Sequence, residues 1–162
     1  MGTRTMSHAG VVAALALIVM LVPACGGDDG GTADPTDAAD GTVSITLKEF
    51  AVVTEPASAA AGTITFSVTN EGPDDVHEFV VIATDLQPTE LPTEDDGSVS
   101  ETGEGMEVID EIEDIPVGEA PELAVDLDAG NYVLICNILE DLPDGTFESH
   151  YAEGMRTGFT VE

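Results

Sequence analysis

The sequence predicts an all-β protein with a Greek-key β-sandwich fold, and two observations support that prediction. Segments in which apolar and polar residues alternate recur along residues 42–162, and this period of two is typical of strands with one buried face. Gly, Pro, Asn and Asp residues that favour turns separate these segments at short intervals, which indicates a sandwich of short strands. The sequence contains no internal repeat, no Rossmann glycine pattern and no phosphate-binding loop.

Four segments in the first half of this region carry the strand signal. Apolar and polar residues alternate at 43–48, and residues 50–53 extend that signal. The clearest strand is at residues 63–69, where every second side chain is apolar. Residues 79–82 are apolar throughout, which indicates a strand at the centre of a sheet.

The second half is less regular. Residues 84–105 are acidic and contain Pro and Gly, so they are predicted to form a long surface loop. Residues 106–115 fit a short helix and a strand almost equally well, and the sequence leaves both open. The remaining strands are predicted at 123–127, 132–135 and 158–161.

Residues 1–24 are predicted to be a lipoprotein signal peptide. Their apolar run from Ala9 to Leu21 is too short to span a bilayer comfortably. The run ends in Val22-Pro23-Ala24-Cys25, which resembles the lipobox of bacterial lipoproteins, so Cys25 is expected to carry lipid. An ordinary secretory leader with an incidental cysteine is the alternative.

The prediction of lipidation divides the chain into three parts. Residues 25–41 are mainly Gly, Asp, Ala and Thr and are expected to be a flexible acidic tether. Residues 42–162 then form the folded domain. Several acyl chains on one cysteine would hold a protein firmly, because each buried methylene adds about 0.8 kcal/mol of membrane affinity. The protein is therefore expected to be lipid-anchored at the cell membrane, on the extracytoplasmic side.

The chain is strongly acidic. All 33 Asp and Glu residues follow Cys25, together with only Lys48 and Arg156, so 33 negative and two positive charges give this part a net charge near −31. Such a surface repels phosphate backbones, which excludes nucleic acid as a partner. The same field would attract a redox partner with a basic surface, although solubility alone also explains acids spread along the chain. A monomer is expected.

Three metal-binding side chains gather near the C-terminus. Cys136, His150 and Met155 offer a thiolate, an imidazole and a thioether. A thiolate, imidazole and a weak axial thioether belong to the ligand set of a blue copper electron-transfer site. A second imidazole is required, and His77 is left to supply it, because His8 lies in the predicted leader.

Each of these residues also has an ordinary explanation. A lone histidine at a strand end is usually structural, a methionine commonly fills a core, and Cys136 could be a buried, inert thiol. If Cys25 carries lipid, however, Cys136 has no disulfide partner in a compartment where disulfides persist. The occurrence of both of these histidines and of Cys136 at predicted strand ends favours a metal site.

The motifs around these residues resemble those of the cupredoxin (plastocyanin- and azurin-like) family. The resemblance covers residues 43–162 and is carried by His77-Glu78-Phe79, by Tyr132-Val133-Leu134-Ile135-Cys136-Asn137 and by His150-Tyr151-x-x-Gly154-Met155. It implies a cupredoxin-like sandwich that holds one type 1 copper ion through His77, Cys136, His150 and Met155. In the family the residue after the cysteine helps to order the ligand loop, and Asn137 occupies that place. Glu78 stands where many members have Asn, and a carboxylate there is expected to favour Cu(II) and to lower the potential.

The ligand spacing requires one further prediction. Thirteen residues separate Cys136 from His150, whereas two to four are usual in the family. Leu142-Pro143-Asp144-Gly145 is a strong turn signal in the middle of this insert. If the insert folds as a hairpin, its ends return side by side, because paired strands lie about 4.8 Å apart. The hairpin would then project from the copper end, where a partner could recognise it.

The leading hypothesis is a blue copper protein that carries single electrons at the outer face of the cytoplasmic membrane. One alternative is a copper-binding or copper-delivery lipoprotein without a redox cycle; another is a metal-free sandwich for protein contacts. An enzyme is not expected, because two histidines cannot build a second copper centre. Neither a Gly-x-Ser-x-Gly nor a His-Glu-x-x-His sequence occurs.

Overall fold

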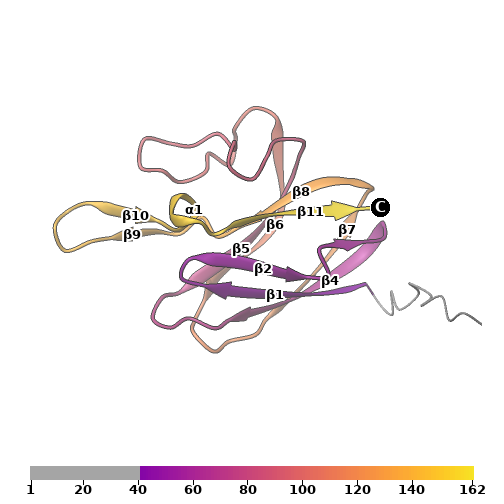
Figure 1. Ribbon diagram of the computed structural model, residues 1–162, viewed down its shortest axis with the longest axis horizontal. Helices are drawn as coiled ribbons and strands as arrows, with labels where there is room; N and C mark the ends of the chain where they lie inside the picture. Colours follow the sequence, from indigo (N-terminus) through magenta and orange to yellow (C-terminus); the bar gives the residue numbers. More distant parts are fainter. Residues whose placement is uncertain (1–40) are drawn as a thin grey trace, which may run out of the picture. The chain divides into compact units, whose positions relative to one another are not determined.

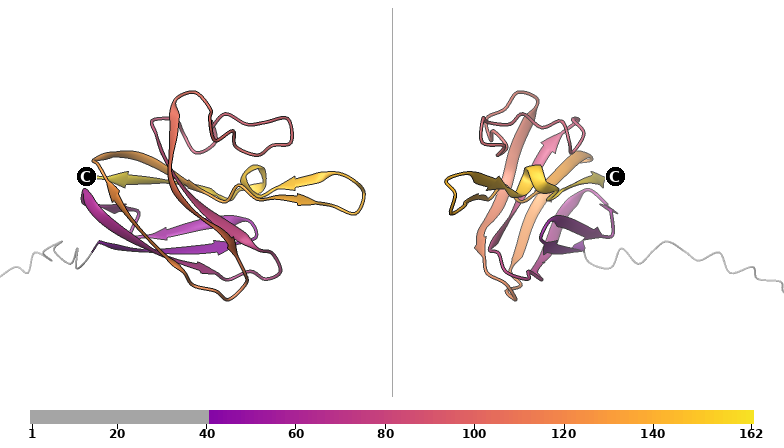
Figure 2. Two further views of the ribbon diagram at one scale, coloured as in Figure 1. Left: turned by 180° about the vertical axis from the view of Figure 1, so that it is seen from behind. Right: turned by 60° about the vertical axis from the view of Figure 1, so that its left-hand side comes forward.

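The computed structural model describes residues 41–162, so the predicted signal peptide, Cys25 and almost all of the tether lie outside the described residues. The described residues form two β-sheets that pack face to face, with a hairpin at one end (Figures 1 and 2). Within this part of the chain, no helix is long and apolar enough to cross a membrane. The predicted Greek-key sandwich is therefore confirmed as an all-β architecture.

The first sheet has four strands, in the order β2, β1, β4, β7. These strands are β2 (Ala51–Glu55), β1 (Thr42–Lys48), β4 (Gly62–Asn70) and β7 (Glu122–Leu127). β1 pairs with β4 in parallel and with β2 in antiparallel orientation, and β4 pairs with β7 in antiparallel orientation. The alternation in β1 and β4 buries one face of each strand, as the sequence predicts.

The second sheet has five strands, in the order β3, β11, β8, β5, β6. These strands are β3 (Ser58–Ala59), β11 (Arg156–Val161), β8 (Gly130–Ile135), β5 (His77–Thr84) and β6 (Met106–Ile115). β5 and β8 lie inside the sheet and pair with each other in antiparallel orientation. The segment that the sequence leaves open between helix and strand is therefore the edge strand β6.

The residues between β5 and β6 cover the outer face of the second sheet. Phe79 and Val81 of β5 belong to the core between the sheets, whereas Val80 and Ile82 pack in a second apolar cluster with Leu91, Val99 and Tyr151. Strands buried on both faces are apolar throughout, which explains the uninterrupted run in β5. Complete burial of one such side chain stabilises the fold by about 1.5–3 kcal/mol. The covering segment, residues 85–105, is called the outer loop below.

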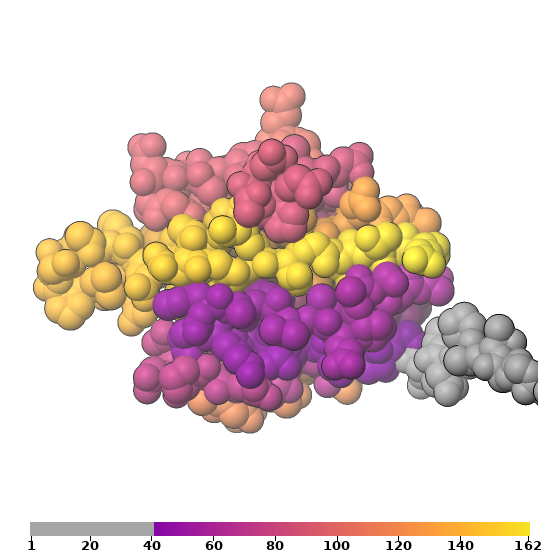
Figure 3. All heavy atoms as spheres, viewed as in Figure 1, coloured from indigo at the N-terminus to yellow at the C-terminus, as the bar shows by residue number. Residues whose placement is uncertain are grey.

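The insert between Cys136 and His150 folds as a hairpin, as predicted. Its strands are β9 (Leu139–Asp141) and β10 (Phe147–Ser149), which pair in antiparallel orientation. The turn is closed by hydrogen bonds from Leu142 N–H to the Thr146 carbonyl (2.9 Å) and from Gly145 N–H to the Leu142 carbonyl (2.9 Å). The hairpin projects beyond the sandwich (Figure 3), and a single helical turn, α1 (His150–Glu153), follows it.

Candidate metal centre

Three adjacent strands bring distant residues to one end of the second sheet. His77 is the first residue of β5, and Cys136 directly follows the last residue of β8. Because β5 and β8 are antiparallel neighbours, the start of one lies beside the end of the other. Met155 directly precedes β11, on the other side of β8, and its carbonyl accepts a hydrogen bond from Cys136 N–H at 3.1 Å. The sheet register therefore places three of the predicted ligands together.

The base of the hairpin returns His150 to the same place. Leu139 pairs with Ser149, and His150 N–H donates to the Ile138 carbonyl at 3.0 Å, two residues from Cys136. The Ser149 side chain caps α1 by accepting a hydrogen bond from Ala152 N–H. The thirteen-residue insert thus closes on itself and leaves Cys136 and His150 as neighbours.

The donor atoms of three predicted ligands converge. Cys136 Sγ lies 3.4 Å from His150 Nδ1 and 3.9 Å from His77 Nδ1, and the two Nδ1 atoms are 3.2 Å apart. All three residues have no exposed surface, so no bulk water reaches the donors. One thiol and two imidazoles gathered at these distances could hold a single metal ion.

Met155 lies beside the site. It is completely buried, and its N–H donates to the His150 carbonyl at 2.9 Å while its carbonyl accepts from Cys136 N–H. Gly154, at φ 134°, makes the turn between α1 and Met155. The backbone of Met155 is therefore bonded directly to two of the predicted ligands, and the structure brings all four predicted residues to one place.

Burial determines the protonation of the donors. It raises the pKa of the Cys136 thiol to about 12, and a metal ion must therefore displace a proton from this sulfur. Burial also lowers the pKa of His77 and of His150 below the usual value for histidine. Both imidazoles are thus neutral at pH 7, which is the form that binds metals.

Glu78 and Asn137 hold the Cys136 sulfur in position. Glu78 N–H donates to Cys136 Sγ at 3.3 Å, and the Glu78 carboxylate accepts from Asn137 N–H at 2.8 Å. The Asn137 side chain accepts from Val99 N–H at 2.6 Å and donates to the Val99 carbonyl at 3.1 Å. Asn137 therefore ties the ligand segment to the outer loop, and hydrogen bonds of this kind orient ligands and tune metal sites.

The Glu78 side chain itself is a half-buried acid. Burial raises its pKa to about 7, the nearby carboxylates of Glu111, Glu101 and Glu113 act in the same direction, and the hydrogen bond from Asn137 opposes them. Its charge at neutral pH is therefore incomplete in the metal-free protein. The prediction from sequence is that a carboxylate at Glu78 favours Cu(II) and lowers the potential, and an incomplete charge would make that effect smaller.

Sequence reasoning missed two residues that contact the histidines. Glu49 Oε1 lies 3.7 Å from His77 Nε2 and accepts hydrogen bonds from Asp74 N–H (3.1 Å) and Asp75 N–H (2.7 Å). Phe50 packs edge-on against the His150 ring, with 5.2 Å between ring centres. Both residues lie in the turn between β1 and β2, far from the ligands in sequence, and no local motif marks them.

Neither outer ring nitrogen has a hydrogen-bond partner among residues 41–162. His77 Nε2 and His150 Nε2 are both buried without one, although Glu49 lies at ion-pair distance from His77. A buried ring nitrogen without a partner is costly, because it loses the hydrogen bonds that water would provide. Metal-bound imidazoles usually donate their outer N–H to a partner, so it is the convergence of the three donor atoms, and not these two nitrogens, that shows that the residues present fit a metal ion.

Comparison with known proteins gives structural matches only. Neither a protein-family model nor a curated protein matches the chain. Among solved structures, the chain is similar to dithionite-reduced auracyanin from the photosynthetic bacterium Roseiflexus castenholzii, with 21% identity over 76% of this chain and 98% of that one and a TM-score of 0.50. It is also similar to rusticyanin from Thiobacillus ferrooxidans, with 15% identity over 76% of this chain and 79% of that one and a TM-score of 0.50. At these identities the likeness establishes the fold.

The chemistry of the site follows from its donors. One thiolate, two imidazoles and a nearby thioether, His77, Cys136, His150 and Met155, are the ligand set of one type 1 copper ion. Thiolate and thioether favour Cu(I), whereas imidazole serves both oxidation states. This ligand set is buried and is held by hydrogen bonds, so it suits a metal ion whose charge changes by one electron.

Proposed function

We propose that this chain, a cupredoxin by its fold, carries single electrons on one type 1 copper ion. The observation that supports the proposal best is the convergence of Cys136 Sγ and two histidine Nδ1 atoms, all within 3.9 Å of one another and buried. When bound, copper would supply the one-electron chemistry. The thiol and the two imidazoles are already gathered at one place, with Met155 bonded to two of these residues through its backbone.

The surrounding residues keep the donors fixed while the charge changes. Glu78 N–H supports the sulfur, Glu49 faces the outer nitrogen of His77, and Phe50 packs against His150. Rigid donors reduce the structural change that accompanies electron transfer, and excluded water keeps the coordination constant. Each of these contacts comes from a strand or turn rather than from a free loop, so it is well placed for this role.

The second part of the proposal concerns the cellular location of the protein and its redox partner. We place the protein on the extracytoplasmic side of the cell membrane, held by lipid on Cys25, and expect a monomer that exchanges electrons with a protein of basic surface. The leader composition and the lipobox-like sequence support the anchor. The net charge near −31, from 33 acidic and two basic residues, supports the choice of partner.

The visible and electron paramagnetic resonance spectra of residues 41–162 loaded with Cu(II) test the copper assignment. This part contains all the described strands and their core, so it forms a unit that folds around its own core. An intense thiolate-to-copper band with narrow parallel hyperfine splitting is expected, and Cys136→Ser should abolish it. Met155→Leu is the matched control, because loss of a weak axial ligand should change the potential while keeping the band.

Redox cycling separates the carrier from a copper-delivery protein. A carrier should recover its full absorbance after reduction with ascorbate and reoxidation with ferricyanide. Rapid loss of Cu(I) to an added chelator would instead favour delivery, and a colourless product would favour a metal-free sandwich.

The anchor is tested on the full chain in a bacterial host. Labelling with an alkyne fatty acid and fractionation of the cells should place the protein, carrying label, in the membrane fraction. Cys25→Ala should lose the label and the membrane association, whereas Cys136→Ser should keep both.

A further inference from the structure

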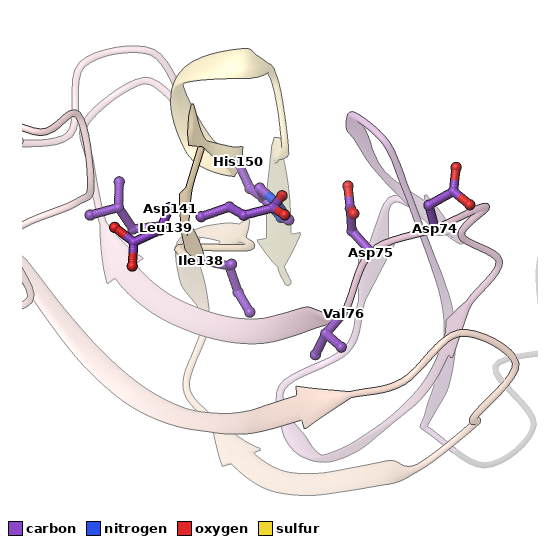
Figure 4. Close-up of a pocket in the computed structure, with 8 residues that line it drawn as sticks. Asp74, Asp75, Val76, Ile138, Leu139, Asp141 and His150 are labelled. Carbon is purple, nitrogen blue, oxygen red and sulfur yellow. The ribbon is translucent and has the colours of Figure 1, made fainter. Parts of the chain in front are cut away.

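A pocket of about 380 Å³ lies between the hairpin and the turn before β5. The turn contributes Asp75 to its wall, the hairpin contributes Glu140, and His150 also lines it. Figure 4 shows Asp75 on one side of the pocket and His150 on the other. Because a water molecule takes up about 30 Å³, this space has room for an ion together with several waters.

Three donor groups meet in this pocket. A ring nitrogen of His150 and carboxylate oxygens of Asp75 and Glu140 lie within 4.8 Å of one another. Nδ1 of His150 faces inward, 3.4 Å from Cys136 Sγ, so Nε2 is the nitrogen that lies toward the pocket. Neither carboxylate forms an ion pair among residues 41–162. Two like charges this close repel each other unless a cation lies between them.

The chain does not supply that cation from the described residues. Lys48 forms an ion pair with Glu71 at 2.8 Å. Arg156 stacks on Tyr151, with 5.0 Å from its guanidinium carbon to the ring centre. No other lysine or arginine occurs within residues 41–162. A cation between the two carboxylates must therefore come from solution.

The Nε2 atom of His150 is an independent indication of a ligand. His150 has no exposed surface, and this nitrogen is buried without a hydrogen-bond partner in the described part of the chain. The other ring nitrogen, Nδ1, belongs to the proposed copper site. A cation held by both carboxylates would also supply the partner that Nε2 lacks.

The backbone fixes the positions of both carboxylate residues. Asp75 N–H donates to Glu49 Oε1 at 2.7 Å, and the Asp75 carbonyl accepts from the Asn70 side chain at 2.8 Å. Glu140 lies in β9 and pairs with Glu148 of β10. The donors therefore come from a hydrogen-bonded turn and a paired strand, and only their side chains must adjust to close on an ion.

The donor types indicate the class of ion. Calcium and magnesium take oxygen ligands, whereas imidazole nitrogen suits zinc and the later transition metals. Zinc also accepts Asp and Glu oxygens, and three protein ligands with a water in the fourth position are a common zinc site. One imidazole and two carboxylates therefore favour Zn²⁺ over the hard cations.

We infer that this pocket is a second metal site, in which Asp75, Glu140 and His150 Nε2 bind one Zn²⁺ ion. As zinc binds, the bond between Nε2 and its proton breaks, the bond between Nε2 and zinc forms, and the proton leaves to solvent. Exchange of one proton for Zn²⁺ adds one positive charge beside the copper site, which would favour Cu(I). The sharing of one imidazole by two metals rests on the proposed copper function, whereas zinc in the pocket does not.

Equilibrium dialysis of copper-free residues 41–162 against zinc chloride tests the site, with mass spectrometry to count zinc per chain. We expect two zinc ions, one at the three converged donors of the candidate metal centre and one in the pocket. A large excess of calcium chloride is present throughout, because calcium fills sites made of carboxylates alone.

Paired variants separate the pocket from the overall charge. Asp75→Asn combined with Glu140→Gln, the pocket pair, should bind one zinc ion. Asp128→Asn combined with Glu107→Gln, the control pair, removes two exposed charges at strand ends opposite the predicted ligands and should bind two. Two zinc ions in the pocket pair would place the second ion elsewhere, and equal loss in both pairs would show that binding follows net charge. Either result would overturn the inference.

The same counts separate this inference from the proposed function. If the unaltered protein binds one zinc ion and the pocket pair binds none, the pocket holds zinc and the three converged donors do not. That result would support the inference and contradict the candidate metal centre. One zinc ion in both proteins would support the metal centre and overturn the inference.

Nuclear magnetic resonance of the histidine ring nitrogens shows which atom binds the second ion. The second equivalent of zinc should remove the Nε2 proton of His150 and shift the signal of that nitrogen, whereas His77 Nε2 should keep its proton. A second zinc ion that binds and leaves the His150 Nε2 signal unchanged would be held by carboxylates alone, and the inference would fail.

Discussion

The two histidines of the site differ in what faces their outer ring nitrogens. His77 Nε2 lies 3.7 Å from Glu49 Oε1, and backbone N–H groups of Asp74 and Asp75 hold this carboxylate in place. His150 instead lines the acidic pocket, and none of residues 41–162 bonds to its Nε2. The fold therefore places a carboxylate opposite the outer nitrogen of His77 and a pocket beside His150, although both outer nitrogens are buried without a hydrogen-bond partner among residues 41–162.

The site can be divided into two halves. We call the surroundings of His77 and Cys136 the closed half, and the surroundings of His150, with its pocket, the open half. Glu78 and Asn137 connect the sulfur and the residue after it to the outer loop through a chain of hydrogen bonds. The two halves therefore differ in role. The closed half holds the donor atoms in place, and the open half has a pocket beside His150. Variants that affect only one half should therefore change different properties.

Removal of each imidazole should give the sharpest contrast. In His150→Gly, added imidazole is expected to enter through the adjacent pocket of about 380 Å³ and to restore the intense visible band of the Cu(II) form. In His77→Gly, Glu49 and the backbone that holds it block the way, so the band should stay lost. Titration with imidazole while the absorbance is recorded checks both expectations. Equal rescue of the two variants, or rescue of His77→Gly alone, would contradict the distinction.

The pH dependence of stability should report on the closed half. The pKa of Glu78 is about 7 in the folded apoprotein against 4.5 in the unfolded chain, so the folded state binds the extra proton between these values. The free energy of unfolding should therefore fall as pH rises from about 4.5 to 7, by on the order of 3 kcal/mol from this group. Urea unfolding of the apoprotein at pH 5 and pH 8 measures the fall.

Glu78→Gln isolates that contribution. The amide oxygen can still accept the Asn137 N–H, but it cannot be charged, so the fall that Glu78 causes should disappear. The opposing rise from His77 and His150 should remain, because their lowered pKa values make the unfolded chain bind more protons in the acidic part of this range. Glu107→Gln, an exposed acid on the same sheet, should keep the dependence of the unaltered protein. If the two variants behave alike, general repulsion among the acids and not Glu78 sets the slope.

The comparison also shows how far the sequence predicts the fold. Alternation identified β1 and β4, and the apolar run identified β5, because burial patterns map directly onto side-chain period. The sequence did not decide between a helix and a strand for β6. This strand lies at the edge of the sheet and is exposed along much of its length, and its register with β5 shifts between Val81 and Ile82. A shift of register breaks the period of two on which the prediction depends.

The site was predictable where chemistry is concentrated in local motifs. The metal-binding side chains of four residues identified the predicted ligands His77, Cys136, His150 and Met155. The Pro-Asp-Gly turn signal predicted the hairpin that brings Cys136 and His150 together. Glu49, Phe50 and the pocket were not predictable, because they depend on how the β1–β2 turn and the hairpin lie against the ligands. Contacts between segments distant in sequence leave no local pattern.

Glu49→Gln should raise the reduction potential. Glu49 is 11% exposed, so water screens its charge poorly. If the Glu49 carboxylate stands about 7 Å from the copper ion, in an effective dielectric of about 20, its negative charge favours Cu(II) over Cu(I) by about 2.4 kcal/mol. This free energy corresponds to about 100 mV for one electron. Redox titration of the copper form measures the shift. Asp128→Asn, an exposed acid in the turn before β8 and so at the end of that strand opposite Cys136, is the control and should change the potential by less than half as much; a larger shift there would contradict the assignment of the effect to Glu49.

Shortening the hairpin should have the smallest effect, because its base and not its tip holds His150. Replacement of residues 141–147 by Asn-Gly keeps the pairs of Glu140 with Glu148 and of Leu139 with Ser149, and Asn-Gly favours a two-residue hairpin turn. The visible band should stay unchanged and the free energy of unfolding should change by about 0.6 kcal/mol or less, because closure entropy varies slowly with loop length. Ser149→Ala, which removes the cap of α1 and the bond to Gly97, should cost about 1 kcal/mol and broaden the copper spectrum. If the shortened hairpin lost the visible band while Ser149→Ala kept it, the tip of the hairpin rather than its base would position His150.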